Sequence, residues 1–97
     1  MGVPEEVTGF EWDEDKRLKN IEKHALDFFD APDVLEGPCL YLPARTAEGG
    51  PRSMAIGLLD DVCVSIIYTM RSSVLRVISM RKARNGERQH DYKIFGS

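Results

Sequence analysis

The second half of the chain contains three apolar runs rich in β-branched residues, which predict three β-strands. The runs cover residues 53–60, 62–69 and 74–80. Only a few residues separate each run from the next, which is enough for a hairpin but too short for a helical crossover. The pattern therefore predicts an antiparallel β-meander.

The segments around the meander predict a weaker strand, a loop and a helix. Residues 39–42 form a short apolar stretch, and residues 43–52 are rich in proline and glycine, which is typical of a loop. A final helix is expected from about Arg81 to Tyr92. Side chains alternate between the two faces of a strand. In the strand before this helix, one face is therefore expected to carry Arg76, Ile78 and Met80, and the other Leu75, Val77 and Ser79.

The first half predicts a short strand followed by an amphipathic helix. Residues 9–12 favour the strand, and Asp13 is a good N-cap for a helix that runs to about His24. Apolar residues recur at helical spacings at Leu18, Ile21 and Ala25. The polar face of this helix carries Lys16, Arg17, Lys19, Asn20 and Lys23.

A second, shorter helix is predicted over residues 28–35 and ends at Gly37-Pro38. Either Asp27 or Asp30 can cap its N-terminus. Asp30 is favoured because Pro32 then lies in the first turn, where a proline is tolerated.

Together these elements predict one α+β domain over residues 1–97, with residues 1–8 as a loose leader. A small antiparallel meander is packed by two N-terminal helices and one C-terminal helix. No apolar run approaches the roughly 18–20 residues that cross a bilayer. Residues 1–8 also lack the apolar core of a signal peptide. We therefore expect a cytoplasmic protein that does not associate with membranes.

The composition is that of an ordinary globular protein, with 42% hydrophobic and 30% charged residues. Its two cysteines, Cys39 and Cys63, lie in separate apolar runs and lack C-x-x-C spacing. No set of carboxylates, histidines and cysteines has the spacing of metal ligands. We expect two reduced thiols, no metal and no other cofactor.

Charge is divided unevenly along the chain, although the net charge is only −3. Residues 1–69 carry a net charge of −8, whereas residues 70–97 carry +5. The basic residues of the second segment are Arg71, Arg76, Arg81, Lys82, Arg84, Arg88 and Lys93. Because they lie on a predicted strand and the helix after it, they predict an ordered anion site that faces phosphates.

Fixed cations suit RNA cleavage because a guanidinium stays charged and pairs bidentately with phosphate oxygens. Arg76 is a mid-strand charge that needs either a bound anion or a salt bridge to an acid such as Glu11. Arg81 stands at a predicted helix N-terminus, where a cation is disfavoured, and such local conflicts often mark function.

Acid–base chemistry has three candidates. Lys23 and His24 suit phosphate binding and proton transfer, although a solvated helix face and capping of the last carbonyls are the alternatives. Glu87 is either a general base or an ordinary helix-surface partner of Arg88. Further candidate phosphate ligands, for which solvated surface positions are the main alternative, are Arg52, Thr69, Arg71, Lys82 and Arg88.

Several of these residues belong to a pattern that resembles the BrnT-type toxins. Its first part is Phe10-Glu11-Trp12-Asp13 with Lys16, Asn20, Lys23-His24 and Phe28. Its second part is Arg52, Ile56-Gly57, Tyr68-Thr69, Arg71, Arg76-Val77-Ile78-Ser79, Arg81-Lys82-Ala83 and Glu87-Arg88. The resemblance covers about residues 9–90, and the chain departs from the pattern at Pro32, at residues 43–51 and at Met80.

BrnT-type toxins are similar to RelE-like ribonuclease toxins of type II toxin–antitoxin pairs. The resemblance implies a RelE-like fold and RNA cleavage that arrests growth and translation. It also implies a BrnA-like antitoxin with a ribbon-helix-helix DNA-binding part, joined to the toxin in a heterotetramer. Two other classes stay open: a non-catalytic module that holds a DNA-binding protein or RNA, and a structural protein with a solvated basic face.

Overall fold

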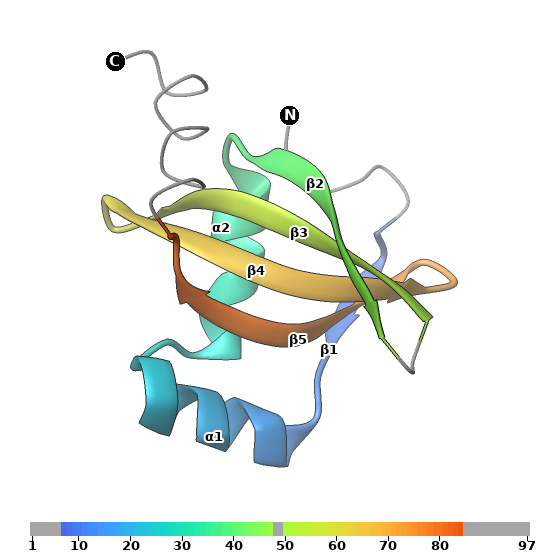
Figure 1. Ribbon diagram of the computed structural model, residues 1–97, viewed down its shortest axis with the longest axis horizontal. Helices are drawn as coiled ribbons and strands as arrows, with labels where there is room; N and C mark the ends of the chain where they lie inside the picture. Colours follow the sequence, from blue (N-terminus) through green and yellow to red (C-terminus); the bar gives the residue numbers. More distant parts are fainter. Residues whose placement is uncertain (1–6, 48–49, 85–97) are drawn as a thin grey trace.

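The computed structural model describes residues 7–47 and 50–84, which form a five-stranded sheet with two α-helices and a 3-10 turn (Figure 1). The sheet order is β1-β5-β4-β3-β2. In chain order the elements are β1 (Gly9–Glu11), α1 (Glu14–His24), η1 (Phe28–Asp30), α2 (Ala31–Glu36), β2 (Leu40–Ala47), β3 (Gly50–Leu59), β4 (Val62–Arg71) and β5 (Val74–Lys82). The fold class is α+β, as the sequence predicts.

The sheet is mixed rather than purely antiparallel. Strands β3 to β5 form the predicted meander and β2 extends it, but β1 pairs in parallel with β5, with Glu11 opposite Arg76. Just before β1, the backbone N–H of Thr8 donates to the Ser73 carbonyl at 2.8 Å. The sequence gives no direct sign of this pairing because β1 and β5 are separated by the whole meander.

Helix α1 starts where predicted, but it faces the sheet with a different side. The Asp13 carboxylate accepts hydrogen bonds from the backbone N–H groups of Asp15 and Lys16. Leu18, in the predicted apolar stripe, is 51% exposed, whereas Asn20 is buried. The predicted stripe is therefore wrong, because a polar residue on the opposite side of the helix makes the contact with the sheet.

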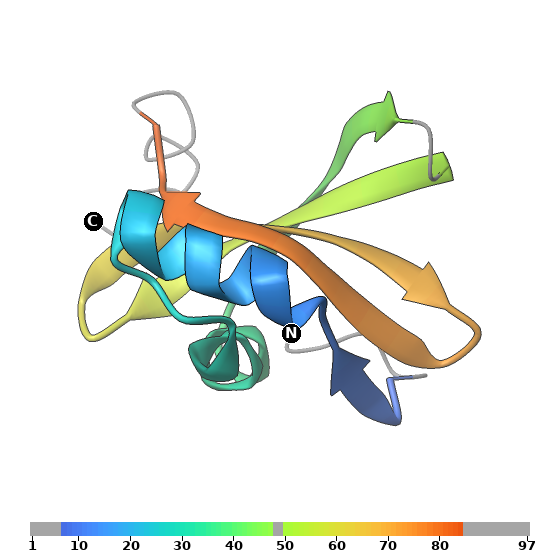
Figure 2. The same cartoon turned by 90° about the horizontal axis from the view of Figure 1, so that it is seen from below.

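Asn20 bonds to two backbone groups at once. Its Oδ1 accepts from the Met80 N–H at 3.1 Å, and its Nδ2 donates to the Leu26 carbonyl at 2.9 Å. Strand β1 pairs with β5 only as far as Arg76, so the edge of β5 beyond it has no strand partner there. Helix α1 runs along this edge (Figure 2), and Asn20 supplies the hydrogen bond that a further strand would otherwise make.

Arg17, also assigned to the polar face, ties α1 to the following segment. It pairs with Glu14 at 2.6 Å and with Asp27 at 3.0 Å. Its guanidinium carbon lies 4.7 Å from the centre of the Phe29 ring. Because Arg17 is engaged by these three residues, we assign it a structural role.

Asp27, and not the favoured Asp30, makes the capping hydrogen bond of the second helical segment. Asp27 caps η1 by accepting from the Phe29 N–H at 3.0 Å, and α2 follows with Pro32 in its first turn. Asp30 precedes α2, but its side chain makes no capping bond. The helix ends at Gly37, as predicted.

Two predicted boundaries in the second half are wrong. Residues 43–47 and 50–52, expected in a loop, continue β2 and β3, since Pro43 still lies opposite Ser53 and Ala44 opposite Arg52. Arg81 and Lys82 do not begin a helix, because they pair with Ser65 and Val64 as the last residues of β5. Ala83 and Arg84 follow β5 without helical structure, and the rest of the predicted helix, residues 85–92, lies outside the described residues.

The faces of β5 change phase at Ile78. Ser79 lies opposite Ile67, but Val77 lies opposite the next residue, Tyr68, so Ile78 is the extra residue of a β-bulge. As a result Met80 is fully buried with Val77 and does not share the face of Arg76. The predicted grouping of Arg76, Ile78 and Met80 is therefore wrong.

The core lies between α2 and one face of the sheet. Phe28, Val34 and Leu35 of the helical layer are at most 1% exposed and pack with Ala55 and Ile66 of the strands. Gly57 allows the closest approach: a Cβ there would lie 2.8 Å from the Cys39 sulfur and 2.9 Å from Val34.

Asn20→Ala is expected to lower the free energy of unfolding by about 2–3 kcal/mol, because two backbone groups lose buried partners. Urea denaturation measures the loss. Leu18→Ala on the exposed side of the same helix is the control and should change stability by less than about 0.5 kcal/mol. Equal losses in the two variants would contradict the assigned role of Asn20.

Gly57→Ala is expected to cost about 1–3 kcal/mol through overpacking against Cys39 and Val34. Gly9→Ala is the matched control, because a Cβ added to this strand glycine meets nothing within 4 Å. Thermal unfolding of both variants measures the difference. A Gly57→Ala protein as stable as the Gly9→Ala protein would show that α2 can move away from the sheet at little cost.

Candidate nucleic-acid interface

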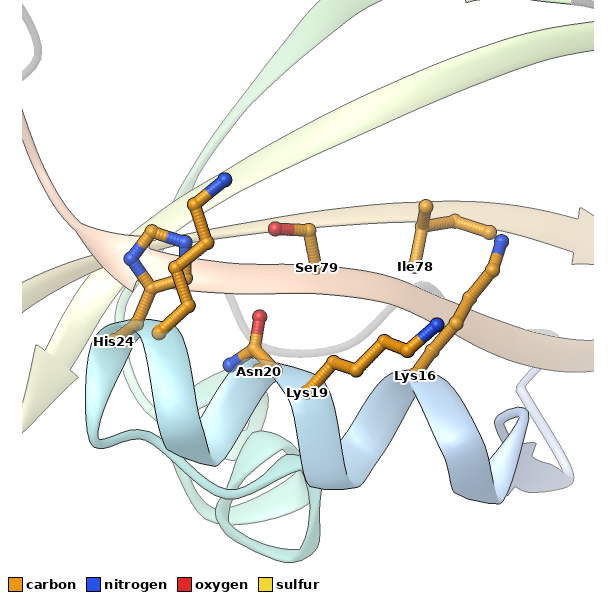
Figure 3. A pocket seen from close by; sticks show the side chains of 7 residues that line it. Lys16, Lys19, Asn20, His24, Ile78 and Ser79 are labelled. Carbon is orange, nitrogen blue, oxygen red and sulfur yellow. The ribbon is translucent and has the colours of Figure 1, made fainter.

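A cleft of about 180 Å³ lies between α1 and the edge of β5 (Figure 3). It is lined by Lys16, Lys19, Asn20, Lys23, His24, Ile78 and Ser79. None of these lining residues is a carboxylate, whereas three are lysines. We call this site the lysine cleft; its chemistry suits an anion such as a phosphate.

Helical spacing explains why the three lysines meet here. Lys16, Lys19 and Lys23 are three, four and seven residues apart, so they project from neighbouring positions of α1. Asn20 lies among them and fixes this side of the helix against β5. Like charges at these spacings repel each other by a few tenths of a kcal/mol per pair. A cost of this kind, repeated along one face, is common where a site binds an opposite charge.

His24 ends α1 and is half-buried. It lines the lysine cleft and also a second cavity of about 390 Å³ on its other side. Cations at a helix C-terminus are favoured by the dipole, so a purely structural role for His24 also stays open.

The second cavity combines apolar walls with charged groups. It is lined by His24, Ala25, Leu26, Asp30, Leu59, Asp60, Val62 and Lys82. Partial burial raises the pKa of the Asp30 carboxyl, and the nearby carboxylates of Asp27, Asp33 and Asp60 raise it further.

Arg76 forms a salt bridge with Glu11, which was predicted from the sequence as the alternative to a bound anion. Its Nη1 lies 3.1 Å from a carboxylate oxygen of Glu11 on β1. Leu75 and Val77 on either side point into the core, so Arg76 lies on the opposite face of the sheet. About 25% of its side chain is exposed there.

Two more predicted phosphate ligands lie beside Arg76 on this face. Thr69 is opposite Arg76 in β4, and Ser53 pairs with Tyr68, which places Arg52 next to Thr69. The Thr69 hydroxyl donates to the Pro51 carbonyl at 3.0 Å. Arg52, Thr69 and Arg76 therefore form a row across three strands.

The remaining basic candidates do not converge on one point. Arg71 is exposed at the end of β4, and Lys82 lies opposite Val64, seven residues earlier in that strand. At about 3.3 Å per residue, Arg71 and Lys82 stand roughly 23 Å apart along the sheet. Arg81 is half-buried opposite Ser65, between these two ends. Glu87 and Arg88 lie outside the described residues.

Sequence reasoning missed five of the seven lining residues of the lysine cleft: Lys16, Lys19, Asn20, Ile78 and Ser79. Lys16 and Lys19 were assigned to a solvated helix face, and Ser79 was placed with core residues. The helical spacing of the lysines was a usable signal. Ser79 carried none, because the bulge at Ile78 decides which way it points.

The fold and the cleft define a small α+β protein with a basic groove along one sheet edge. Residues 12–87 match the family model described as the ribonuclease toxin BrnT of type II toxin–antitoxin systems. The chain therefore belongs to the BrnT family, which confirms the resemblance seen in the sequence. No curated protein matches the chain.

Membership makes the chain a ribonuclease toxin, with RNA as its substrate and an antitoxin as its partner. Neither helix of the described ranges has the length and apolar character needed to cross a membrane. Among the same residues, no three His, Cys, Asp or Glu side chains are grouped as metal ligands would be.

Asp30→Asn is expected to stabilise the protein at neutral pH. Because the pKa of Asp30 is raised in the folded state, ionisation costs stability as the pH rises through the unfolded and then the folded pKa. The gain at pH 7 should be at most about 1 kcal/mol, and it should vanish near pH 3, below the ordinary Asp pKa of about 3.9. Urea denaturation at both pH values measures it, and an equal gain at pH 3 would contradict an effect of charge.

Proposed function

We propose that this toxin is a metal-independent endoribonuclease that holds the RNA backbone in the lysine cleft. The main support for this proposal is that three lysines and an imidazole line the cleft and that none of its lining residues is a carboxylate. RNA binding in this place needs no rearrangement of α1, because Asn20 already holds the helix against β5.

The reaction needs three things: activation of the 2′-hydroxyl, stabilisation of the charged phosphate and protonation of the leaving 5′-oxygen. Lys23 is suited to the second task, with Lys16 and Lys19 holding neighbouring phosphates. His24 adjoins the cleft, and its imidazole can both accept and donate a proton, which suits it to a proton transfer. Glu87 is retained as a candidate general base.

The row Arg52–Thr69–Arg76 and the cations Arg71, Arg81, Lys82 and Arg88 are proposed as further RNA contacts. The described members of this set are spread over β3, β4 and β5 rather than gathered at one point. A spread of this kind suits an extended single strand, whose phosphates are distributed along its length. Arg76 and Arg81 are retained, beside Lys23, as candidates for stabilising the reacting phosphate.

We further propose that the partner is a BrnA-like ribbon-helix-helix antitoxin that assembles with this single-domain toxin into a heterotetramer in the cytoplasm. Antitoxin binding over the lysine cleft would block RNA. The complex would contact DNA only through the antitoxin.

Inducible expression without antitoxin is expected to arrest growth of bacteria with cleaved RNA, and cleavage by the purified protein should persist in EDTA. The variant K16A/K19A/K23A should abolish arrest. Its binding to a non-cleavable RNA should fall at least ten-fold at low salt. Each lost phosphate contact on a single strand lowers the salt slope by roughly 0.7, so the slope should drop by about 2.

The matched control is K16R/K19R/K23R, which keeps the charge and should keep most of the RNA affinity. Normal growth with intact RNA, from folded wild-type protein, would contradict the proposed activity. Loss of cleavage in EDTA would contradict metal independence alone.

One observation favours the second candidate, binding without cleavage: the salt bridge to Glu11 already occupies Arg76. His24→Ala separates the two functions. A catalytic His24 predicts lost cleavage with RNA affinity retained, whereas a pure binding module shows no cleavage before or after the change.

A further inference from the structure

The second cavity adjoins the lysine cleft through one shared wall, the side chain of His24. Its volume of about 390 Å³ lies in the range of small-molecule sites, roughly 300–1,000 Å³. An RNA strand whose phosphate lies in the cleft therefore has a cavity next to it that can receive the adjoining base.

The walls of this cavity suit the face of a nucleobase. Leu26, Leu59 and Val62 supply apolar surface, and Val62 keeps 39% of its own surface exposed. Bases of single-stranded RNA are recognised when they are splayed out, packed between side chains and hydrogen-bonded along their Watson–Crick edges. The imidazole of His24, which lines both the cavity and the cleft, adds a ring on which a base can stack.

The charged side chains of the cavity are two carboxylates and one ammonium group, beside the imidazole of His24. Asp30 and Asp60 carry carboxylates, whereas Lys82 carries an ammonium group. Within the described part of the chain, no hydrogen bond or ion pair engages the Asp30 carboxylate. Partial burial and the neighbouring carboxylates raise the pKa of Asp30, and no hydrogen-bond donor among the described residues lowers it again. A ligand that brings N–H donors would supply what this carboxylate lacks.

We propose that this cavity, the base pocket, binds a guanine that adjoins the phosphate held in the lysine cleft. Guanine presents N1–H and N2–H side by side, and a carboxylate such as Asp30 accepts both in a bidentate pair. The neighbouring O6 is an acceptor that the Lys82 ammonium can reach as a donor. Adenine and cytosine place an acceptor where guanine has N1–H, and uracil has no exocyclic amine. The proposal rests on the proposed function, whose substrate preference it names.

The first test is binding of the four nucleoside 5′-monophosphates, followed by NMR. Guanosine monophosphate should bind about 10- to 100-fold more tightly than the others, the range expected of one bidentate pair. It should shift the resonances of Asp30, Asp60 and Val62. Asp30→Asn should remove this preference, whereas Asp33→Asn should keep it. Asp33 is the matched control, because it is an exposed aspartate of α2 that does not line the cavity.

The second test maps cleavage sites in an RNA of mixed sequence. Cleavage by the wild-type protein should concentrate next to guanines, and Asp30→Asn should spread it over all bases, whereas Asp33→Asn should keep the wild-type pattern. Cleavage without guanine preference, or a preference unchanged in Asp30→Asn, would overturn the base pocket and leave the nuclease intact. Absence of any cleavage would overturn the proposed function instead. The binding test with nucleoside monophosphates would then show by itself whether the cavity prefers guanine. If Asp30→Asn weakened antitoxin binding and left nucleotide preference unchanged, the cavity would be a protein-docking site and the proposal would fail.

Discussion

The two hydrogen bonds of Asn20 are the constraint on which the proposed site depends. One polar side chain joins the Met80 N–H, on the unpaired edge of β5, to the Leu26 carbonyl after α1. The contact determines which side of α1 faces the strand, and thereby places Lys16, Lys19 and Lys23 along the cleft. A leucine at this position would bury more apolar surface but leave a backbone donor unpaired. The edge of the sheet therefore needs a polar helix face, and this need coincides with the chemistry proposed for the cleft.

The β-bulge at Ile78 has a comparable effect on the strand. Without the extra residue, Met80 would share the face of Arg76 and Ser79 would point into the core. With it, Met80 fills the core while Ser79 lines the lysine cleft. Bulges often redirect side chains in this way at functional positions. The same shift keeps Arg76 and Arg81 on the face away from α2, so cations extend along β5 without any of them entering the core.

The charge division within the sequence has a different meaning in the folded protein. The excess in residues 70–97 predicted one basic site, but Arg76 is paired with Glu11 and the other described cations are spread along the sheet. The densest group of cations comes from α1, in the half of the chain that is acidic overall. None of the residues lining the lysine cleft is acidic. Glu14 and Asp27 pair with Arg17, and Asp30 lines the base pocket.

Local sequence determined most of the elements, because their signals depend on neighbours along the chain: the Asp13 cap, the stop at Gly37, and the meander of β3 to β5 with its short turns. The family was also readable from the order of its residues over about residues 9–90, and the family model matches residues 12–87. Contacts between distant segments were decided only by the tertiary structure. The parallel β1–β5 pair, the burial of Asn20 and the phase change at Ile78 each depend on a partner more than ten residues away. Helical period could group the three lysines, but only the packing of α1 on β5 turns them toward a cleft, since the same period fits a solvated face equally well.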